Sequence, residues 1–440
     1  MKKILIITYY WPPSGGAGVQ RWLKFTKYLP EFGVQPVVLT VDSAQASYPQ
    51  RDESLLHEVS PRAEVHRTPT FELYNLYLRL TGKKEIPYGG FANEGKETFL
   101  QRLAKMVRGN FFIPDPRKGW NRYAFRKAAE LIRKQGIDTV VTTSPPHSTQ
   151  LIGLRLKRKL GVRWVADLRD PWTDIYYYRQ LYHSALARKI DRSLELKVLQ
   201  QADQLVVVSN DVKRIFSEKG GAAVQQKIQV IPNGYDEEDF EQEAPVGNGK
   251  FIITYTGTIA ASYRLDGFLA ALASLPAEWQ QETVLRFVGK IPPLILEQVR
   301  QAVPHVEIDL TGYVDHRKSV GYLLQASVQL LIIPQVENNL GIVPGKFFEY
   351  LASGKPVLAL GPKGSDLDRL IGETGCGALF EYDDSDAISH FLREGLDGKL
   401  TGGKREMAHR YSRKALTQQM AGLLTAAAET QDLSHKTHSR

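Results

Sequence analysis

Short apolar runs typical of buried strands alternate with helical patterns through most of this 440-residue chain. The run over residues 4–7 is continuously apolar, as expected for a strand covered on both faces of a parallel sheet. Apolar residues from Val19 to Phe32 then follow a helical period, and the next strand-like run begins just after Gly33. Repeated units of strand, loop, helix and strand predict a doubly wound α/β fold.

The alternation of strand and helix patterns stops at an acidic segment and then restarts. Residues 232–250, PNGYDEEDFEQEAPVGNGK, are acidic, poor in apolar residues and interrupted by Pro and Gly, which is typical of a linker. We therefore predict an N-terminal domain over 1–240, a second domain over 241–415, and a C-terminal helix with a polar tail over 416–440. A stretch rich in aromatic and basic residues interrupts the rhythm near 70–130. It either packs on the first domain or forms an amphipathic surface that lies on a membrane.

The net charge of +9 is unevenly distributed. Residues 101–200 contain 21 Lys and Arg against 8 Asp and Glu. This excess suggests an acidic partner, such as anionic lipid, nucleic acid or a phosphorylated substrate, or else a solvated basic face. The single cysteine, Cys376, excludes an intramolecular disulfide and a cysteine-built zinc site. Without a recognisable signal peptide or spanning segment, a cytoplasmic location is expected.

A glycine-rich loop, WPPSGGAG, joins the first predicted strand to the first helix. Backbone N–H groups at a helix start attract anions, and glycine lets the main chain approach a ligand closely. The loop lacks the third glycine of a dinucleotide fingerprint, so a dehydrogenase with Asp42 on the ribose is a poor match. A plain connection that needs glycine is the simpler alternative.

The stretch PGKFFEYLASGKP predicts a short helix between Pro344 and Gly354. Lys346 lies in its first turn, where a cation opposes the helix dipole unless an anion is bound. Glu349 follows about one turn later. The pattern favours a phosphate-bearing ligand, whereas the alternative is a solvated lysine beside a surface glutamate.

Six motifs occur in order on successive predicted strand ends: WPPSGGAG, DLRDPWTD, VIPNGYD, YTGT, TGYVDH and GKFFEYLASGKPVL. In this order the chain resembles the retaining, family-four-like GT-B glycosyltransferases of bacterial polysaccharide and cell-envelope synthesis. The resemblance implies two Rossmann-like domains that face a central cleft. It implies sugar transfer from a nucleotide-sugar donor to a glycan or lipid-linked acceptor, without a metal or cofactor and without nucleic acid as a partner.

The resemblance also implies roles for matching residues. Glu349 corresponds to the carboxylate that holds the donor ribose hydroxyls, and Lys346 to a ligand of the donor diphosphate. Gly15 and Gly16 belong to the loop that the diphosphate and sugar approach. Two further residues have looser matches: Tyr313 for the loop that receives the base, and Arg264 for a second basic ligand of the diphosphate.

The chain departs from the family pattern at two positions. Counting back from Glu349 places Gly341 where the family commonly has a first glutamate near the transferred sugar. Arg169 stands where the family often has a histidine after a strand of the first domain, so the role of that histidine passes to Asp167, Arg169 or Asp170.

His147, which begins a predicted helix, is a further catalytic candidate or else has a helix-start role alone. Residues 366–368, DLD, are expected in a turn rather than in a metal site.

Two other function classes remain open from the sequence: a non-catalytic nucleotide-sugar-binding partner of another transferase, and a nucleotide-sugar epimerase on the same fold. The basic excess and the aromatic-basic stretch further predict a peripheral location on the anionic inner face of the membrane.

Overall fold

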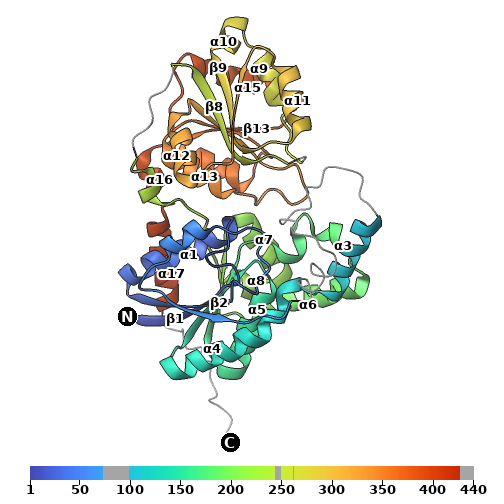
Figure 1. Cartoon of the computed structure of the whole chain (residues 1–440), viewed down its shortest axis with the longest axis vertical. Helices are drawn as coiled ribbons and strands as arrows, with labels where there is room; N and C mark the ends of the chain where they lie inside the picture. Colours follow the sequence, from blue (N-terminus) through green and yellow to red (C-terminus); the bar gives the residue numbers. More distant parts are fainter. Residues whose placement is uncertain (73–98, 243–248, 261, 427–440) are drawn as a thin grey trace, which may run out of the picture.

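The computed structural model describes residues 1–72, 99–242, 249–260 and 262–426. Two α/β domains follow one another along the chain and are stacked in space (Figure 1). Each is built on a parallel sheet whose strand order reverses once, so the predicted pair of doubly wound domains is confirmed. Residues 73–98, which include part of the predicted insertion, and the polar tail beyond residue 426 lie outside the described residues.

The first sheet has the order β3-β2-β1-β4-β5-β6-β7. Its strands are β1 (Lys2–Ile7), β2 (Val34–Val41), β3 (Glu64–Thr68), β4 (Thr139–Ser144), β5 (Arg163–Leu168), β6 (Gln204–Val207) and β7 (Ile228–Val230). The helices around it are α1 (Ala17–Tyr28), α3 (Phe99–Phe111), α4 (Asn121–Gln135), α5 (Ser148–Leu160), α6 (Ala185–Gln201), α7 (Asn210–Gly220) and α8 (Ala222–Gln225). Short 3₁₀ turns connect them: η1 (Leu29–Phe32), η2 (Glu53–Glu58), η3 (Pro116–Trp120), η4 (Trp172–Asp174) and η5 (Tyr178–Leu181).

The second sheet has the order β10-β9-β8-β11-β12-β13. Its strands are β8 (Phe251–Thr258), β9 (Thr283–Lys290), β10 (Glu307–Gly312), β11 (Val328–Ile332), β12 (Val357–Leu360) and β13 (Gly377–Phe380). The turn η6 (Glu237–Phe240) precedes it, and the helices are α9 (Asp266–Ala273), α10 (Ala277–Glu282), α11 (Pro293–Ala302), α12 (His316–Gln325), α13 (Gly345–Ser353), α14 (Asp366–Thr374), α15 (Ser385–Leu396), α16 (Arg405–His409) and α17 (Arg413–Thr425).

Strand β1 shows why the first run of the sequence is continuously apolar. Leu5 and Ile7 pack into one buried cluster with residues of α4 and α5, whereas Ile4 and Ile6 pack into another with residues of α1 and α17. Successive side chains of a strand point to opposite faces, so a strand covered on both sides must be apolar throughout.

The last helix, α17, returns to the first domain. It begins at Arg413, three residues before the predicted start, and Leu416, Met420 and Leu424 join the buried cluster beneath α1. The two domains are therefore connected twice, once through residues 231–250 and once through the segment before α17.

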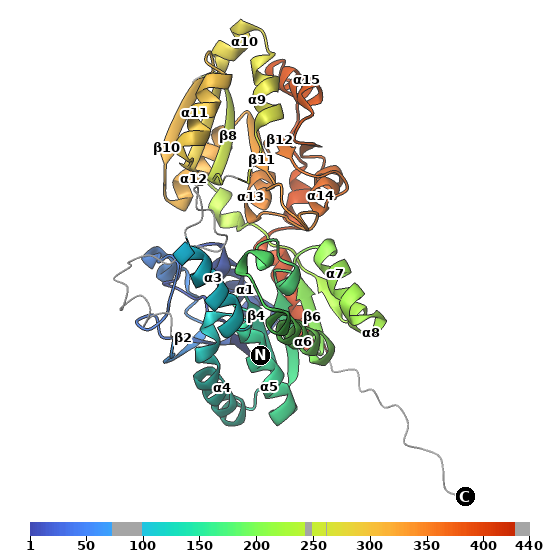
Figure 2. The same ribbon diagram turned by 90° about the vertical axis from the view of Figure 1, so that its right-hand side faces the viewer.

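Loops that follow strands of both sheets meet at the domain boundary. Asn338 donates a hydrogen bond to the backbone oxygen of Asp174 at 2.9 Å, and Arg179 pairs with Glu337 at 2.9 Å. Helices α12, α13 and α14 lie on the side of the second domain that faces α1 and α7 (Figure 1 and Figure 2). This is the region where the candidate site residues gather.

Candidate active site between the two domains

Helix α13 carries the two residues that the sequence singles out for phosphate and ribose binding. Pro344 is its N-cap, and Gly354 ends it in the left-handed conformation, with φ 69°. Phe347, Phe348 and Leu351 are buried on its inner face. The predicted helix is thus confirmed, and its apolar face fixes the direction in which Lys346 and Glu349 project.

Lys346 is held against strand β8. Its Nζ donates a hydrogen bond to the backbone oxygen of Thr256 at 2.8 Å and lies 3.9 Å from the ring centre of Tyr255. Burial lowers the pKa of this ammonium to about 7, although Glu349 opposes the shift. The lysine that opposes the helix dipole is therefore poised to gain charge when an anion approaches.

Glu349 is half-buried, and this desolvation raises the pKa of its carboxyl group. His316, Arg413 and Lys346 oppose the rise, while Asp239 adds to it. His316, the first residue of α12, lies 3.1 Å from Asp239 through Nε2. That hydrogen bond raises the pKa of His316 to about 9, so the imidazole is a cation at neutral pH. His316 ends the TGYVDH motif but is not among the site residues predicted from the sequence.

Two further predicted donor ligands lie in loops of the second domain. Tyr313 is 71% exposed in the loop after β10. Arg264, in the loop after β8, forms ion pairs with Asp266 at 3.0 Å and Asp383 at 2.6 Å. Its guanidinium is therefore engaged by carboxylates of its own domain, and its role at a diphosphate stays a prediction.

In the glycine-rich loop of the first domain, close packing requires glycine at position 15, and the backbone conformation favours glycine at position 16. A Cβ at Gly15 would lie 3.2 Å from side-chain atoms of both Gln50 and Asp52, and the Gly15 N–H donates to the Gln50 oxygen at 2.9 Å. Gly16 caps α1 with φ 85°, a conformation that favours glycine. The close neighbour that requires glycine at position 15 is thus the segment 50–52 of the same chain.

The loop after β5 brings together the catalytic candidates of the first domain. Arg169 donates to the backbone oxygens of Ser144 at 2.8 Å and Gly18 at 3.0 Å. Burial raises the pKa of Asp170, against the opposing charge of Arg169. A carboxylate whose pKa is raised is a stronger base than an ordinary aspartate, which suits it to accept a proton.

Asp167 has a structural role and not a catalytic one. It is fully buried and accepts hydrogen bonds from Arg21 at 3.2 Å, Trp22 at 2.8 Å and Thr143 at 2.8 Å. These contacts tie β5 to α1 and β4. A carboxylate saturated in this way is poorly placed to take the role of the family histidine.

His147 immediately precedes α5 and stacks on Trp172, with ring centres 4.7 Å apart. Burial, aided by the charges of Arg169 and Lys219, lowers the pKa of His147 to about 3. The imidazole is therefore neutral and weakly basic at physiological pH. Its environment favours Asp170 over His147 for proton transfer, although the structure brings both near Arg169.

Gly341 lies against the first domain. A Cβ at this glycine would come within 3.0 Å of Asp211 Cβ and of Ser209 Oγ, at the start of α7. A glutamate here would have to displace that helix start. The absence of the family's first glutamate thus coincides with a close domain contact.

The prediction that residues 366–368 form a turn is wrong. They form the first turn of α14, because Ser365 caps the helix by accepting a hydrogen bond from the Asp368 N–H. The Asp366 carboxylate reaches the first domain, where it accepts from Asp211 N at 2.7 Å and Asn210 Nδ2 at 3.2 Å. Within the described ranges, no group of three or more His, Cys, Asp or Glu side chains is arranged to hold a metal ion.

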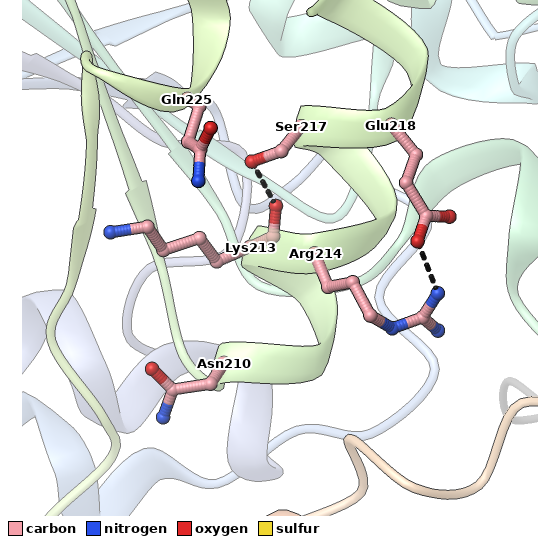
Figure 3. A pocket seen from close by; sticks show the side chains of 6 residues that line it. All are labelled: Asn210, Lys213, Arg214, Ser217, Glu218 and Gln225. Carbon is pink, nitrogen blue, oxygen red and sulfur yellow. Dashed lines mark hydrogen bonds and ion pairs between the residues drawn. The ribbon is translucent and has the colours of Figure 1, made fainter. Parts of the chain in front are cut away.

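A shallow cavity of about 460 Å³ lies on α7 and α8 (Figure 3). Asn210, Lys213, Arg214, Ser217, Glu218 and Gln225 line it. On its wall Arg214 pairs with Glu218 at 2.7 Å. None of the predicted site residues lies in it.

Two family models match the chain in succession. Residues 89–239 match Glycosyltransferase Family 4, and residues 250–397 match Glycosyl transferases group 1. Together the matches span more than half of the chain, so it belongs to the GT-B glycosyltransferases. The glycosyltransferase family inferred from the ordered motifs is confirmed, whereas retention stays a prediction.

Two similar proteins are also named as glycosyltransferases. The chain is 24% identical over 315 residues to "Probable glycosyltransferase WbjE" of Pseudomonas aeruginosa, covering 66% of this chain and 76% of that protein. It is also 24% identical over 201 residues to TuaH of Bacillus subtilis, a glycosyltransferase named for teichuronic acid biosynthesis, covering 44% and 49%.

Solved structures agree with the fold. Sucrose-phosphate synthase of Thermosynechococcus elongatus superimposes with a TM-score of 0.60 at 17% identity, covering 96% of this chain and 98% of that one. HepE of Anabaena in complex with UDP gives 0.55 at 12% identity, covering 96% and 95%. A protein of Listeria monocytogenes named as a UDP-N-acetylglucosamine 2-epimerase gives 0.52 at 12%, covering 96% and 95%. The fold alone therefore does not separate transferase from epimerase, whereas the family models do.

Within the part of the chain that the structure describes, no helix is both long and apolar enough to cross a bilayer.

Proposed function

We propose that this glycosyltransferase moves a sugar, with retention, from a nucleotide-sugar donor to a glycan or lipid-linked acceptor in bacterial polysaccharide or cell-envelope synthesis. The observation that carries the proposal is the pairing on α13 of Lys346 with a half-buried Glu349, where burial lowers the lysine pKa to about 7. The names of WbjE and TuaH support the biosynthetic role, and the HepE complex supports a UDP-linked donor.

In this proposal the second domain binds the donor. The Glu349 carboxylate accepts hydrogen bonds from the vicinal ribose hydroxyls, since an ionised carboxylate can accept two at once. Lys346 and the N–H groups at the start of α13 face the diphosphate, because anions favour a helix N-terminus. The cationic His316 assists by favouring the ionised form of Glu349.

Departure of the nucleoside diphosphate then relies on charge already in place. Lys346, which takes up its proton from solvent when the donor binds, stands as a cation beside the leaving oxygens and stabilises the negative charge that develops on them as the sugar–phosphate bond breaks. We propose that this replaces a metal ion, so that turnover persists in a chelator. Asp170, whose pKa burial raises, is our candidate for moving the acceptor proton, with Arg169 holding the loop in place.

A surface of the first domain fits a membrane-bound acceptor. Helix α3 leaves a stripe of apolar side chains exposed, and α6 continues it; the residues are Leu103, Met106, Val107, Phe111, Leu186 and Ile190. Gly109 packs so closely that a Cβ would lie 2.2 Å from the Leu181 oxygen, which sets α3 against η5, the turn that precedes α6. Exposed Arg188, Lys189 and Arg192 lie on α6. Apolar and basic residues together favour peripheral binding to the anionic cytoplasmic face of a membrane.

The proposal is tested by incubating the purified chain with a panel of nucleotide sugars and candidate acceptors, with and without EDTA. Release of nucleoside diphosphate identifies a transferase and its donor, while NMR of the product's anomeric proton reports retention. Inversion of the free nucleotide sugar would instead indicate an epimerase. Nucleotide binding without release or epimerisation under any condition would indicate a non-catalytic binding protein.

A further inference from the structure

Arg413 occupies an unusual place where the chain crosses back to the first domain. It is the first residue of α17, and its backbone N–H donates to the Tyr235 oxygen at 2.7 Å. Ser412, the N-cap, accepts from the Ala415 N–H at 3.2 Å. The start of this helix is therefore anchored to the other crossing segment, between the two domains.

The guanidinium of Arg413 is buried without a partner. The residue is only 8% exposed, and its enclosed Nη1 has no hydrogen-bond partner. Within the described ranges, no carboxylate forms an ion pair with it. Burying an unpaired cation is costly, so natural structures rarely keep one unless something pairs with it in a functional state.

The two guanidiniums nearest in charge effect to Arg413, those of Arg21 and Arg169, already have hydrogen-bond partners. Arg21 is saturated by Asp167 and by the oxygens of Ile231 and Pro232, both at 2.9 Å. Arg169 is likewise bonded to backbone oxygens. Arg413 is thus the uncommitted member of a group of three guanidiniums at the domain boundary.

Neighbouring carboxylates do not satisfy Arg413 either. Asp236 is already bound by Lys24 at 2.7 Å and Tyr28 at 2.5 Å. Glu349 acts on Arg413 through space, and Arg413 in turn opposes the raised pKa of Glu349. This mutual influence places the guanidinium within electrostatic range of the proposed donor site.

We infer that Arg413 is a further donor-binding residue, whose guanidinium binds the diphosphate of the donor from the inter-domain side. The inference rests on the proposed function. It adds a ligand that belongs to the crossing helix rather than to either sheet, so donor binding would also hold the two domains in a fixed relation. Guanidinium groups suit this task because they donate two parallel hydrogen bonds to phosphate oxygens.

The test compares R413Q and R413K with wild type, using UDP, uridine and inorganic pyrophosphate as probes in calorimetric titrations and thermal melts. The matched control is K414Q, which removes the same charge one residue along, at a half-exposed lysine paired with Glu31 at 2.7 Å. R413Q is expected to weaken UDP and pyrophosphate binding at least tenfold and to leave uridine unchanged. R413K should retain part of the affinity, and K414Q all of it.

The apo melting temperature of R413Q should equal or exceed that of wild type, because an unpaired buried charge is removed. Unchanged UDP affinity in R413Q would overturn the inference. So would an equal loss of UDP and uridine, which would mean that Arg413 acts only through Glu349. A wild type that turns over no nucleotide sugar would instead refute the proposed function, independently of these variants.

Discussion

The ammonium of Lys346 donates a hydrogen bond to the backbone oxygen of Thr256 at 2.8 Å, joining residues 90 positions apart. This contact links the first turn of α13 to the end of β8, next to Gly257, whose Cβ position would lie 3.5 Å from the same Nζ. The lysine is therefore fixed before any ligand arrives, while burial keeps its pKa near 7. Its charge state should consequently respond to an anion.

Nucleotide binding should take up a proton at Lys346. With the pKa of the free lysine at about 7, most of the side chain is neutral at pH 8, and a bound diphosphate should raise that pKa. Calorimetry of UDP binding at pH 8 in buffers of different ionisation enthalpy should show net proton uptake, absent in K346M. Affinity should fall as pH rises from 7 to 9. Proton uptake of zero in wild type would contradict the assignment.

Lys346 should also make the free energy of unfolding of the ligand-free protein depend on pH. Between the folded pKa of about 7 and the unfolded value of about 10.4, the unfolded state binds more protons, so this group makes stability rise with pH across that window. K346M should remove that dependence and be as stable as wild type, or more so, at pH 7. Urea unfolding at pH 7 and pH 9 checks this.

Glu349 should be needed for catalysis but not for folding. Glu349→Gln keeps the shape and removes the charge that accepts the ribose hydroxyls. We expect kcat/KM to fall by about 1.5–3 kcal/mol in transition-state terms, the size of a charge-assisted hydrogen bond. The matched control is Glu373→Gln on the outside of α14, which should have no effect. A folded Glu349→Gln enzyme with full activity would remove the ribose role.

Gly16 offers a test that separates backbone strain from blocked ligand access. Gly16 and Gly33 have similar positive φ values, 85° and 77°, and a Cβ at Gly33 would have no atom within 4 Å. Alanine at Gly33, with ψ 13°, should cost about 1–2 kcal/mol of stability. Alanine at Gly16, whose ψ of 173° lies in a region nearly confined to glycine, should cost about 1–3 kcal/mol. Only Gly16→Ala should also lower turnover at least about a hundredfold, or about 2.7 kcal/mol, while retaining UDP affinity. Equal turnover in the two variants would exclude this loop from the active site.

His147 should make the fold sensitive to acid. Its pKa is about 3 when folded and about 6.5 when unfolded, so the unfolded state binds more protons between these values. The stability is complete above pH 6.5 and is lost as pH falls. His147→Asn should abolish this loss, a difference of up to about 2 kcal/mol at pH 5 relative to pH 7.5. Parallel pH profiles of wild type and variant would contradict the buried neutral imidazole.

The exposed stripe on α3 and α6 should bind anionic vesicles. Flotation at low salt should recover the chain with anionic but not neutral vesicles, since each basic residue near the surface adds about 1 kcal/mol. Replacing Phe111 and Leu186, which are 73% and 67% exposed, with serine should weaken binding. Leu294→Ser, at a 66% exposed leucine on α11 of the second domain, is the control. Equal partition of wild type to both vesicle types, or to neither, would refute the membrane role.

Local chemistry made the elements around the site predictable. The apolar run of β1 and the limits of α13 at Pro344 and Gly354 depend on residues adjacent in sequence, so both elements were predicted correctly. The first turn of α14 was not predicted, because its composition is typical of a turn and a single N-cap, Ser365, starts the helix there. The ordered motifs predicted the class of enzyme because five of the six lie at or just after the carboxyl end of a strand and the sixth forms α13, so their order follows the order of the folded elements.

The sequence by itself therefore determined the alternating elements, the two doubly wound domains and the identity of Lys346 and Glu349 as candidates. Only the tertiary structure decided the direction in which the pKa of each group shifts and which charged side chains lie near it. His316 reaches Glu349 electrostatically from another helix, and Arg413 does so from a helix that packs on the opposite domain. The physical reason is that desolvation and through-space charge depend on distance in the folded chain, which local sequence patterns do not encode.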